Sequence, residues 1–264
     1  MKTILDTIID QKRKEVQILK AKFKYTDFEQ TAFFNRECIS FSNSIRESEF
    51  ALITEIKRKS PSAGIINDQL DPKTLGLAYY ESGATAISCL TDNFFFGGLN
   101  SDLETLRESV PIPILRKDFI IDEFQIFEAK AIGADAILLI AEALTKEEAL
   151  HLTIIAQSLG LEVLMECHDR KNSEKLNDLI DVIGVNNRNL HLQKTTLETS
   201  YELIDYLPKS KLKISESGIK TYDEIRKLSS LGYHGALIGE SILSNSNPGD
   251  FIHSLKLKKN NYVY

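Results

Sequence analysis

The strongest constraint on the fold is a repeat of short apolar runs separated by stretches with helical periodicity. From Ala51 onward the runs recur about every 25 residues, the size of one strand, one helix and their connections. Such runs, which are typical of buried strands, occupy residues 51–57, 86–90, 112–116, 136–140, 162–166, 182–185, 213–215 and 236–238. Eight βα units without a long linker predict a closed (β/α)8 barrel, a TIM barrel of the α/β class, with a doubly wound open sheet as the competitor.

The stretches between the runs have the spacing of amphipathic helices. Residues 123–131 and 146–157 are examples, and several such stretches end at a glycine, as helices commonly do. Residues 1–24 carry apolar side chains at helical spacing ahead of the first run. We therefore expect a single barrel domain over residues 1–264, with residues 1–48 as an N-terminal helical extension.

The composition argues against several classes of protein. A net charge of -6 argues against a general nucleic-acid binder, and the longest apolar runs are far too short to cross a membrane. The first ten residues lack the apolar core of a secretory signal, so we expect a cytoplasmic protein. Cys38, Cys89, Cys167 and the five histidines show no metal-ligand spacing, and His168-Asp169 has no third ligand spaced to match, so no metal is expected.

Charged and amide side chains stand where the predicted strands end, and barrel active sites form at that end. Strand alternation places Glu55 and Lys57 on one face, although a structural salt bridge would also explain this pair. Each of the other residues, taken alone, fits a helix cap or a surface ion pair. Together they form a ring that could bind anions and exchange protons: Glu55, Lys57, Lys117, Glu166, Asn186 and Glu216.

Glycines after the last two predicted strands indicate a phosphate site. Gly218 and Gly239 stand where barrels often bind phosphate through backbone N–H groups, although a loop glycine can also merely permit a turn. Ser60, in the turn after the first strand, would add a hydroxyl group. Glu240 would add its N–H while its carboxylate turns away, because that carboxylate would repel the phosphate.

Three aromatic residues and two glycines follow the second predicted strand. Phe94, Phe95 and Phe96 precede Gly97-Gly98, a composition that suits a mobile lid or a wall that stacks on a ring. A hydrophobic cluster beneath a long loop is the alternative interpretation.

Several of these segments occur together, in this order, in a known family. They are Glu55-Ile-Lys-Arg-Lys-Ser-Pro-Ser62, Leu90-Thr-Asp92 with Phe95-Phe96-Gly97-Gly98, Leu115-Arg-Lys-Asp-Phe-Ile120, Gly184-Val-Asn-Asn-Arg-Asn-Leu190, Ser215-Glu-Ser-Gly218 and Leu237-Ile-Gly-Glu-Ser241. The chain closely resembles the indole-3-glycerol-phosphate synthases of tryptophan biosynthesis, in register from the N-terminal helix to the eighth strand. The resemblance implies conversion of 1-(2-carboxyphenylamino)-1-deoxyribulose 5-phosphate to indole-3-glycerol phosphate by ring closure, decarboxylation and dehydration, without a metal or another cofactor.

The resemblance also implies roles for individual residues. Lys117 would be the general acid that protonates the substrate carbonyl, and Glu166 would accept or donate a proton in the dehydration. Lys57 would pair with the substrate carboxylate and could compete with Lys117 for an acid role. The remaining implied positions are Asn186 and Glu55 around the developing hydroxyl, Glu216 and Ser217 in the pocket, Arg188 at its rim, Ser60, Gly218, Gly239 and Glu240 at the phosphate, and Phe96 and Leu138 at the anthranilate ring.

Two other functions fit a phosphate-binding barrel. Isomerisation of a phosphoribosyl amine generally needs a paired acid and base, often Asp with Cys or Asp, which no strand end offers. A non-catalytic sensor of a phosphorylated ligand would have no need of Lys117 and Glu166. The partner that we expect is a small phosphorylated substrate, with no nucleic acid and no membrane. The chain is expected to be monomeric, with weak association with other tryptophan-pathway enzymes left open.

Overall fold

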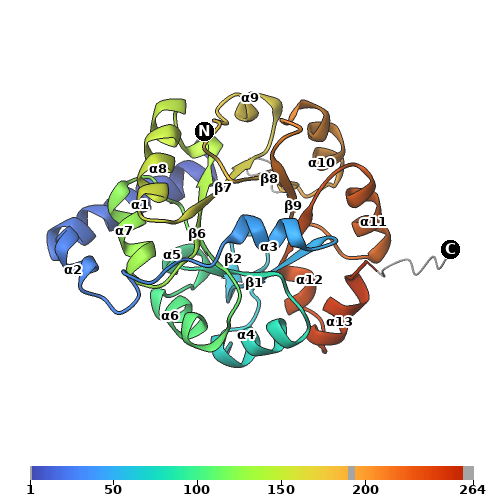
Figure 1. Cartoon of the computed structure of the whole chain (residues 1–264), viewed down its shortest axis with the longest axis horizontal. Coiled ribbons are helices and arrows are strands. Elements are labelled where there is room, and N and C mark those ends of the chain that lie inside the picture. Colours follow the sequence, from blue (N-terminus) through green and yellow to red (C-terminus); the bar gives the residue numbers. More distant parts are fainter. Residues whose placement is uncertain (1, 190–193, 258–264) are drawn as a thin grey trace.

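A computed structural model describes residues 2–189 and 194–257 and shows a closed barrel of parallel strands surrounded by helices (Figure 1). Leu190, at the end of one quoted segment, lies outside the described residues, as do the two chain ends. The barrel strands are β1 (Ala51–Ile56), β4 (Ala86–Leu90), β5 (Ile114–Lys117), β6 (Ala136–Ile140), β7 (Glu162–Cys167), β8 (Val182–Asn186), β9 (Leu212–Glu216) and β10 (Gly235–Ile238). Because β10 pairs with β1, the described sheet has no open edge, and the predicted (β/α)8 barrel is confirmed.

The third predicted strand begins later than the sequence pattern indicates. Residues 112–116 are expected, whereas β5 covers Ile114–Lys117. Pro113 has no N–H to give to a strand ladder, so a start beyond it is favoured. The shift places Lys117 in the strand itself, where pairing with Leu90 of β4 fixes the backbone.

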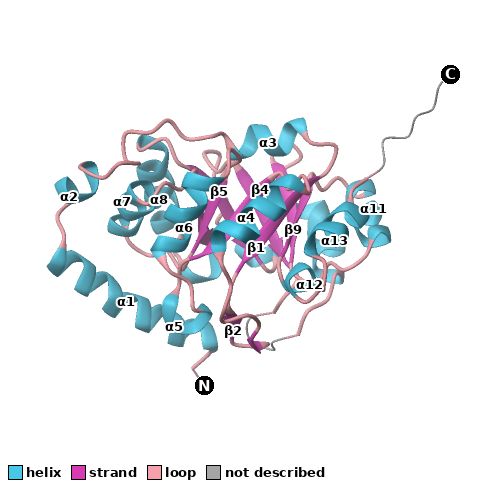
Figure 2. Ribbon diagram, turned by 90° about the horizontal axis from the view of Figure 1, so that it is seen from below, coloured by secondary structure: helices cyan, strands magenta, loops and turns pink. Residues whose placement is uncertain are grey.

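The outer helices lie around the barrel wall (Figure 2). They are α4 (Pro72–Glu81), α6 (Asn100–Ser109), α7 (Glu123–Ala131), α8 (Lys146–Ser158), α9 (Arg170–Ser173), α10 (Glu198–Leu203), α11 (Tyr222–Ser230), α12 (Glu240–Leu243) and α13 (Pro248–Leu255), with the 3-10 turns η1 (Ala141–Ala143) and η2 (Ile204–Tyr206). Side chains cap the amino ends of many of these helices. At α8, Thr145 Oγ1 accepts from the backbone N–H of Glu148, and the Glu148 carboxylate accepts from the backbone N–H of Thr145. Within the described part of the chain, no helix combines the length and apolarity needed to cross a bilayer.

Three helices precede the barrel, as the predicted N-terminal extension requires. They are α1 (Ile4–Lys22), α2 (Tyr25–Glu29) and α3 (Phe41–Glu47). The buried face of α1 includes Leu5, Ile8 and Ile9, which join the apolar cluster that fills the barrel. Figure 2 shows α1 at the same end of the molecule as the short helix α5 (Asn93–Phe96), so the extension covers one side of the barrel mouth.

A small hairpin that the sequence pattern does not predict follows β1. Its strands are β2 (Lys59–Ser60) and β3 (Gly64–Ile65), which pair antiparallel. Lys59 Nζ donates to the carbonyl oxygen of Phe94 at 2.9 Å, and the guanidinium of Arg58 pairs with Asp102. These contacts join the segment after β1 to the two helices that follow β4, α5 (Asn93–Phe96) and α6.

Candidate active site

A cavity of about 640 Å3 opens at the carboxyl ends of the barrel strands. All but one of the predicted site residues line it: Glu55, Lys57, Phe96, Lys117, Leu138, Glu166, Asn186, Arg188, Glu216, Ser217, Gly218, Gly239 and Glu240. Ser60 is the exception, because its buried Oγ accepts from the backbone N–H of Ala63 at 3.1 Å and stabilises the hairpin turn. The structure therefore brings together the predicted ring and the predicted phosphate end around one space.

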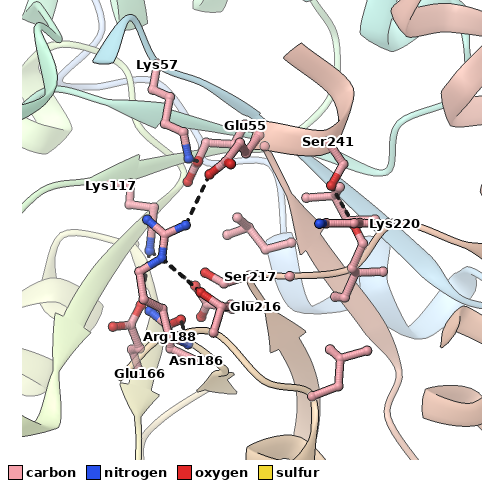
Figure 3. Close-up of a pocket in the computed structure, with 18 of the residues that line it drawn as sticks. Glu55, Lys57, Lys117, Glu166, Asn186, Arg188, Glu216, Ser217, Lys220 and Ser241 are labelled. Carbon is pink, nitrogen blue, oxygen red and sulfur yellow. Dashed lines mark hydrogen bonds and ion pairs between the residues drawn. The ribbon is translucent and has the colours of Figure 1, made fainter. Parts of the chain in front are cut away.

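Lys117 lines the cavity and contacts two glutamates (Figure 3). Its Nζ is 3.1 Å from Glu166 Oε2 and 3.2 Å from Glu216 Oε2. The three residues come from β5, β7 and β9, alternate strands whose inward side chains share a layer of the barrel.

The two glutamates have opposite acidities. Burial would raise the pKa of Glu166, but Lys117 and His168 outweigh burial and lower that pKa to about 2. Burial raises the pKa of Glu216 to about 8, because the attraction of Lys117 does not offset burial and the charge of Glu166. Burial would lower the pKa of Lys117, but Glu166, Glu216 and Glu55 raise it. Lys117 is thus charged near neutral pH, and Glu216 holds a proton more tightly than Glu166 does.

A glycine on the neighbouring strand makes room for this acid. A Cβ on Gly184 would lie 2.0 Å from Glu216 Oε1, so any larger residue would displace the carboxyl group. Glu216 Oε1 has no hydrogen-bond partner among the described groups. Because an unpartnered buried polar atom is costly, it marks a position where a bound molecule could form a hydrogen bond with the carboxyl group.

Glu55 and Lys57 occupy the adjoining wall and share one face, as strand alternation predicts. Lys57 Nζ is 2.6 Å from Glu55 Oε1, so the salt bridge of the alternative interpretation does form. Both side chains are buried and line the cavity, which places the pair within the site. Across the cavity, the Asn186 side chain hydrogen-bonds to Glu166 and its Oδ1 accepts from the backbone N–H of Arg188 at 3.0 Å.

The predicted phosphate end lies beyond this wall. Arg188 Nη1 donates to Ser62 Oγ at 2.6 Å, and its Nη2 is 3.1 Å from Glu240 Oε2. The guanidinium therefore joins the hairpin loop to the start of α12. A Cβ on Gly239 would lie 2.3 Å from Glu55 Oε1, so only glycine fits between the two strand ends.

The backbone turns sharply after β9. Ser217 has φ 68° and Gly218 has φ 81°, two successive residues in the left-handed region. This conformation is costly for serine, and residues held in it often lie at functional sites.

The aromatic residues after β4 form a wall at the other end of the cavity. Asp92 Oδ1 accepts from the backbone N–H groups of Phe95 at 2.8 Å and Phe96 at 3.2 Å and so begins α5. The Phe96 ring lies 5.9 Å from the Phe119 ring and packs on the apolar cluster that contains Leu138. Phe94, by contrast, is 61% exposed. In this structure Phe96 belongs both to the wall of the cavity and to the hydrophobic cluster, so the two interpretations of this segment describe the same arrangement.

His168, considered above only as a metal ligand, lies beside a glutamate of the cavity. His168 Nε2 is 3.4 Å from Glu166 Oε1, and its Nδ1 is 3.2 Å from Glu142 Oε2. In residues 2–189 and 194–257 no group of three His, Cys, Asp or Glu side chains is arranged to hold a metal. The cavity also reaches Tyr201, Lys220 and Lys227, which lie on outer helices and loops and carry no periodic signal.

Comparison with known proteins gives one consistent family. Residues 5–255 match the family model described as indole-3-glycerol phosphate synthase. The indole-3-glycerol phosphate synthase of Bacteroides thetaiotaomicron is 41% identical over 254 residues, covering 96% of this chain and 98% of the relative. That of Chlorobium phaeovibrioides is 40% identical, covering 92% and 95%.

Solved structures show the fold at lower identity. A 3-hexulose-6-phosphate synthase from Salmonella typhimurium superposes with a TM-score of 0.62 at 14% identity, covering 78% of this chain and 96% of that one. A tryptophan synthase subunit alpha from Legionella pneumophila gives a TM-score of 0.59 at 14% identity, covering 81% and 95%.

Proposed function

The chain belongs to the indole-3-glycerol phosphate synthase family, and we propose that it carries out that family's reaction. It would act as a carboxy-lyase that converts 1-(2-carboxyphenylamino)-1-deoxyribulose 5-phosphate to indole-3-glycerol phosphate, carbon dioxide and water. The observation that carries the proposal is Lys117 between Glu166 and Glu216, with an aromatic wall on one side and the Gly218–Gly239 end on the other.

The two ends of the cavity suit the two ends of this substrate. The anthranilate ring would lie against Phe96 and Leu138, and the phosphate would approach Gly218, Gly239 and the backbone of Glu240. The Glu240 carboxylate is held by Arg188, which supports the expectation that only its N–H meets the phosphate. Lys57 would pair with the substrate carboxylate in exchange for its present contact with Glu55.

Ring closure needs an acid at the carbonyl oxygen. As the aromatic carbon attacks the carbonyl carbon, the new carbon–carbon bond forms and the carbonyl electron pair takes a proton from Lys117. The carboxylate then leaves as carbon dioxide, and its electron pair restores the aromatic ring. Glu166, Glu216 and Glu55 raise the pKa of Lys117, so the group is charged and holds its proton before the substrate binds.

Dehydration needs a base on one carbon and an acid on the departing hydroxyl. Glu166, whose pKa is about 2, is ionised near neutral pH and would accept the carbon-bound proton. Asn186 and Glu55 would orient the hydroxyl, which leaves as water after taking a proton. Glu216, with a pKa of about 8, is the protonated carboxyl group beside them.

We also place the enzyme in the cytoplasm as a monomer. The free thiols Cys38, Cys89 and Cys167 support a reducing compartment. Sedimentation at micromolar concentration tests the monomer, and a mass of twice 29.8 kDa would contradict it. Association with other tryptophan-pathway enzymes would raise the sedimentation coefficient only in a mixture.

Glu166→Gln tests whether Glu166 acts in the dehydration and not in the earlier steps. The glutamine keeps the shape but cannot accept a proton, so we expect turnover to fall about 10²- to 10⁴-fold with little change in KM. In a single turnover, carbon dioxide should still be released while indole absorbance does not appear, since only the last step is blocked. Glu147→Gln, on the exposed face of α8, is the matched control.

The outcomes distinguish a wrong role for Glu166 from a wrong assignment of the reaction. Indole formation by Glu166→Gln at the wild-type rate would remove Glu166 from the chemistry. Binding of the substrate by the wild type without carbon dioxide or indole would instead favour the sensor function.

A further inference from the structure

Helix α1 carries a buried lysine that the proposed chemistry does not use. Lys12 has a 5% exposed side chain, and its Nζ lies 2.7 Å from Glu15 Oε2, 3.0 Å from Asp92 Oδ2 and 2.8 Å from Asp118 Oδ1. Lysine is almost never buried without a paired charge, and here two of the partners come from the barrel mouth. The ammonium thus joins the N-terminal helix to the loop after β4 and to the end of β5.

One of these partners holds the aromatic wall. While Asp92 Oδ2 faces Lys12, its Oδ1 accepts the N–H groups of Phe95 and Phe96 that begin α5. Helix α5 has only four residues, so its own hydrogen bonds fix it weakly. The position of the Phe96 ring therefore depends on Asp92, and that of Asp92 depends on Lys12.

The other partner follows Lys117 directly. Asp118 Oδ1 also accepts from the N–H of Phe119 at 2.7 Å, and its Oδ2 accepts from Thr91 Oγ1 at 2.6 Å. Thr91 Oγ1 in turn accepts from Arg116 Nε at 3.0 Å. The network thus fixes the chain around Lys117 and the Phe119 ring that lies beside Phe96.

Within the described residues, the other cation near these two aspartates is already engaged elsewhere. Arg116, the other cation facing them, lies 3.5 Å from Asp118 and is closely paired with Glu128. Without the Lys12 ammonium, Asp92 and Asp118 would be two buried carboxylates that repel each other across the loop that carries Phe96. The repulsion would act at the ring end of the cavity and not at the phosphate end.

We propose that Lys12 is a positioning residue for the ring end of the active site. Through Asp92 and Asp118, α1 sets the Phe96 wall and the chain around Lys117, so the N-terminal extension forms part of the active-site structure and does more than cover the barrel. The proposal rests on the proposed contact between Phe96 and the anthranilate ring.

Inhibitors that mimic each half of the substrate test the proposal. The probes are 2-aminobenzoate for the ring end and inorganic phosphate for the other end, both as competitors of 1-(2-carboxyphenylamino)-1-deoxyribulose 5-phosphate. Lys12→Met keeps the aliphatic stem and removes the ammonium. We expect the inhibition constant of 2-aminobenzoate and the KM to rise about tenfold, with the constant of phosphate changed less than about twofold.

Further variants separate positioning from stability. Lys12→Arg should restore most of the aminobenzoate affinity, and Lys20→Met, which breaks the exposed α1 pair with Asp122, should change neither constant. Asp92→Asn keeps an oxygen that can begin α5 but loses the attraction to Lys12, and it should weaken aminobenzoate selectively. If Lys12→Met does not fold, the Asp92→Asn and Lys12→Arg results decide.

Two results would overturn the proposal. Equal weakening of both inhibitors, or no weakening of either, in folded Lys12→Met or Asp92→Asn would make Lys12 a purely structural residue. Phe96→Leu identifies a failure of the proposed ring site instead, because unchanged aminobenzoate affinity in that variant would mean that the ring does not contact Phe96.

Discussion

Two clusters of buried charges lie at opposite ends of the barrel and differ in how fully they are paired. At the amino end, before β6, Asp135 Oδ1 accepts from Arg36 Nη2 at 2.7 Å and from the N–H of Ile39 at 2.8 Å. Its Oδ2 accepts from Arg107 Nη1 at 2.7 Å and from the N–H of Ile114 at 2.8 Å. At the carboxyl end, Lys117 lies between Glu166 and Glu216, and Glu216 Oε1 has no partner among the described groups.

Charged side chains of the same kinds thus have different roles, depending on how much of their hydrogen-bonding capacity is still unused. The Asp135 carboxylate has two donors on each oxygen and no space for a ligand, so it can only stabilise the fold. The Lys117 cluster borders a cavity and keeps hydrogen-bonding capacity, so it can act on a bound molecule. Substitutions in the two clusters should therefore affect different measured quantities.

Replacing the cation of the cavity cluster should have the largest effect. Lys117→Ala removes the proposed acid, and we expect turnover to fall about 10²- to 10⁴-fold. Indole fluorescence during the reaction measures turnover, and circular dichroism shows whether the variant is folded. A folded variant with near wild-type turnover would remove the distinction between the two clusters.

Replacing the central anion of the other cluster should give the opposite pattern. Asp135→Asn leaves Arg36 and Arg107 without their shared carboxylate, so the free energy of unfolding should fall by about 3–5 kcal/mol. Urea unfolding measures the loss, and turnover per folded molecule should not change. A turnover defect with normal stability would show that this end also affects the chemistry.

The free energy of unfolding should depend on pH through the titration of Glu216. Folding raises the Glu216 pKa from 4.5 to about 8, so between these values the folded state holds a proton that the unfolded chain has lost. The free energy of unfolding therefore falls as pH rises, by about 1 kcal/mol between pH 6 and pH 7. Glu216→Gln lacks this titration and should lose less stability across the same interval. Identical pH dependence of urea unfolding in both proteins would mean that Glu216 is ionised in the folded state.

An exposed pair should have the smallest effect. Lys20 Nζ lies 2.7 Å from Asp122 Oδ2, but the lysine side chain is 45% exposed. Lys20→Met should change the free energy of unfolding by less than about 0.5 kcal/mol, because solvent screens such pairs. A loss comparable to that of Asp135→Asn would show that short distance alone, without burial, determines the contribution of a pair.

The barrel and the meeting of the polar strand-end residues around one cavity could be predicted because both follow from strand periodicity. Apolar runs fix the strands, and polar residues at their carboxyl ends must then meet around one opening. The protonation states of Glu166 and Glu216 could not be predicted, because they depend on burial and on neighbours from distant segments. The sequence pattern gives no reason to separate these two glutamates.

Residues outside the strand ends carry no comparable signal. Lys12 stands four residues from Ile8 and from Val16 and so lies on the buried face of α1, but the sequence does not show that two aspartates of the barrel mouth pair with it there. Ser60 is predicted to bind phosphate from its turn position, and the structure shows its hydroxyl accepting a hydrogen bond within the hairpin, a contact that the sequence pattern does not predict. Both cases depend on how loops pack, which spacing along the chain does not determine.

The pairing of β1 with β10 has a consequence for how the molecule forms. These strands come from the two ends of the barrel sequence, so their contact closes a very long loop and should form late in folding. The same seam brings Gly239 against Glu55, so the proposed phosphate end of the cavity does not exist until the last strand is in place. During refolding, helical signal should return first and enzymatic activity only when the seam has closed. Activity is therefore a direct kinetic probe of barrel closure.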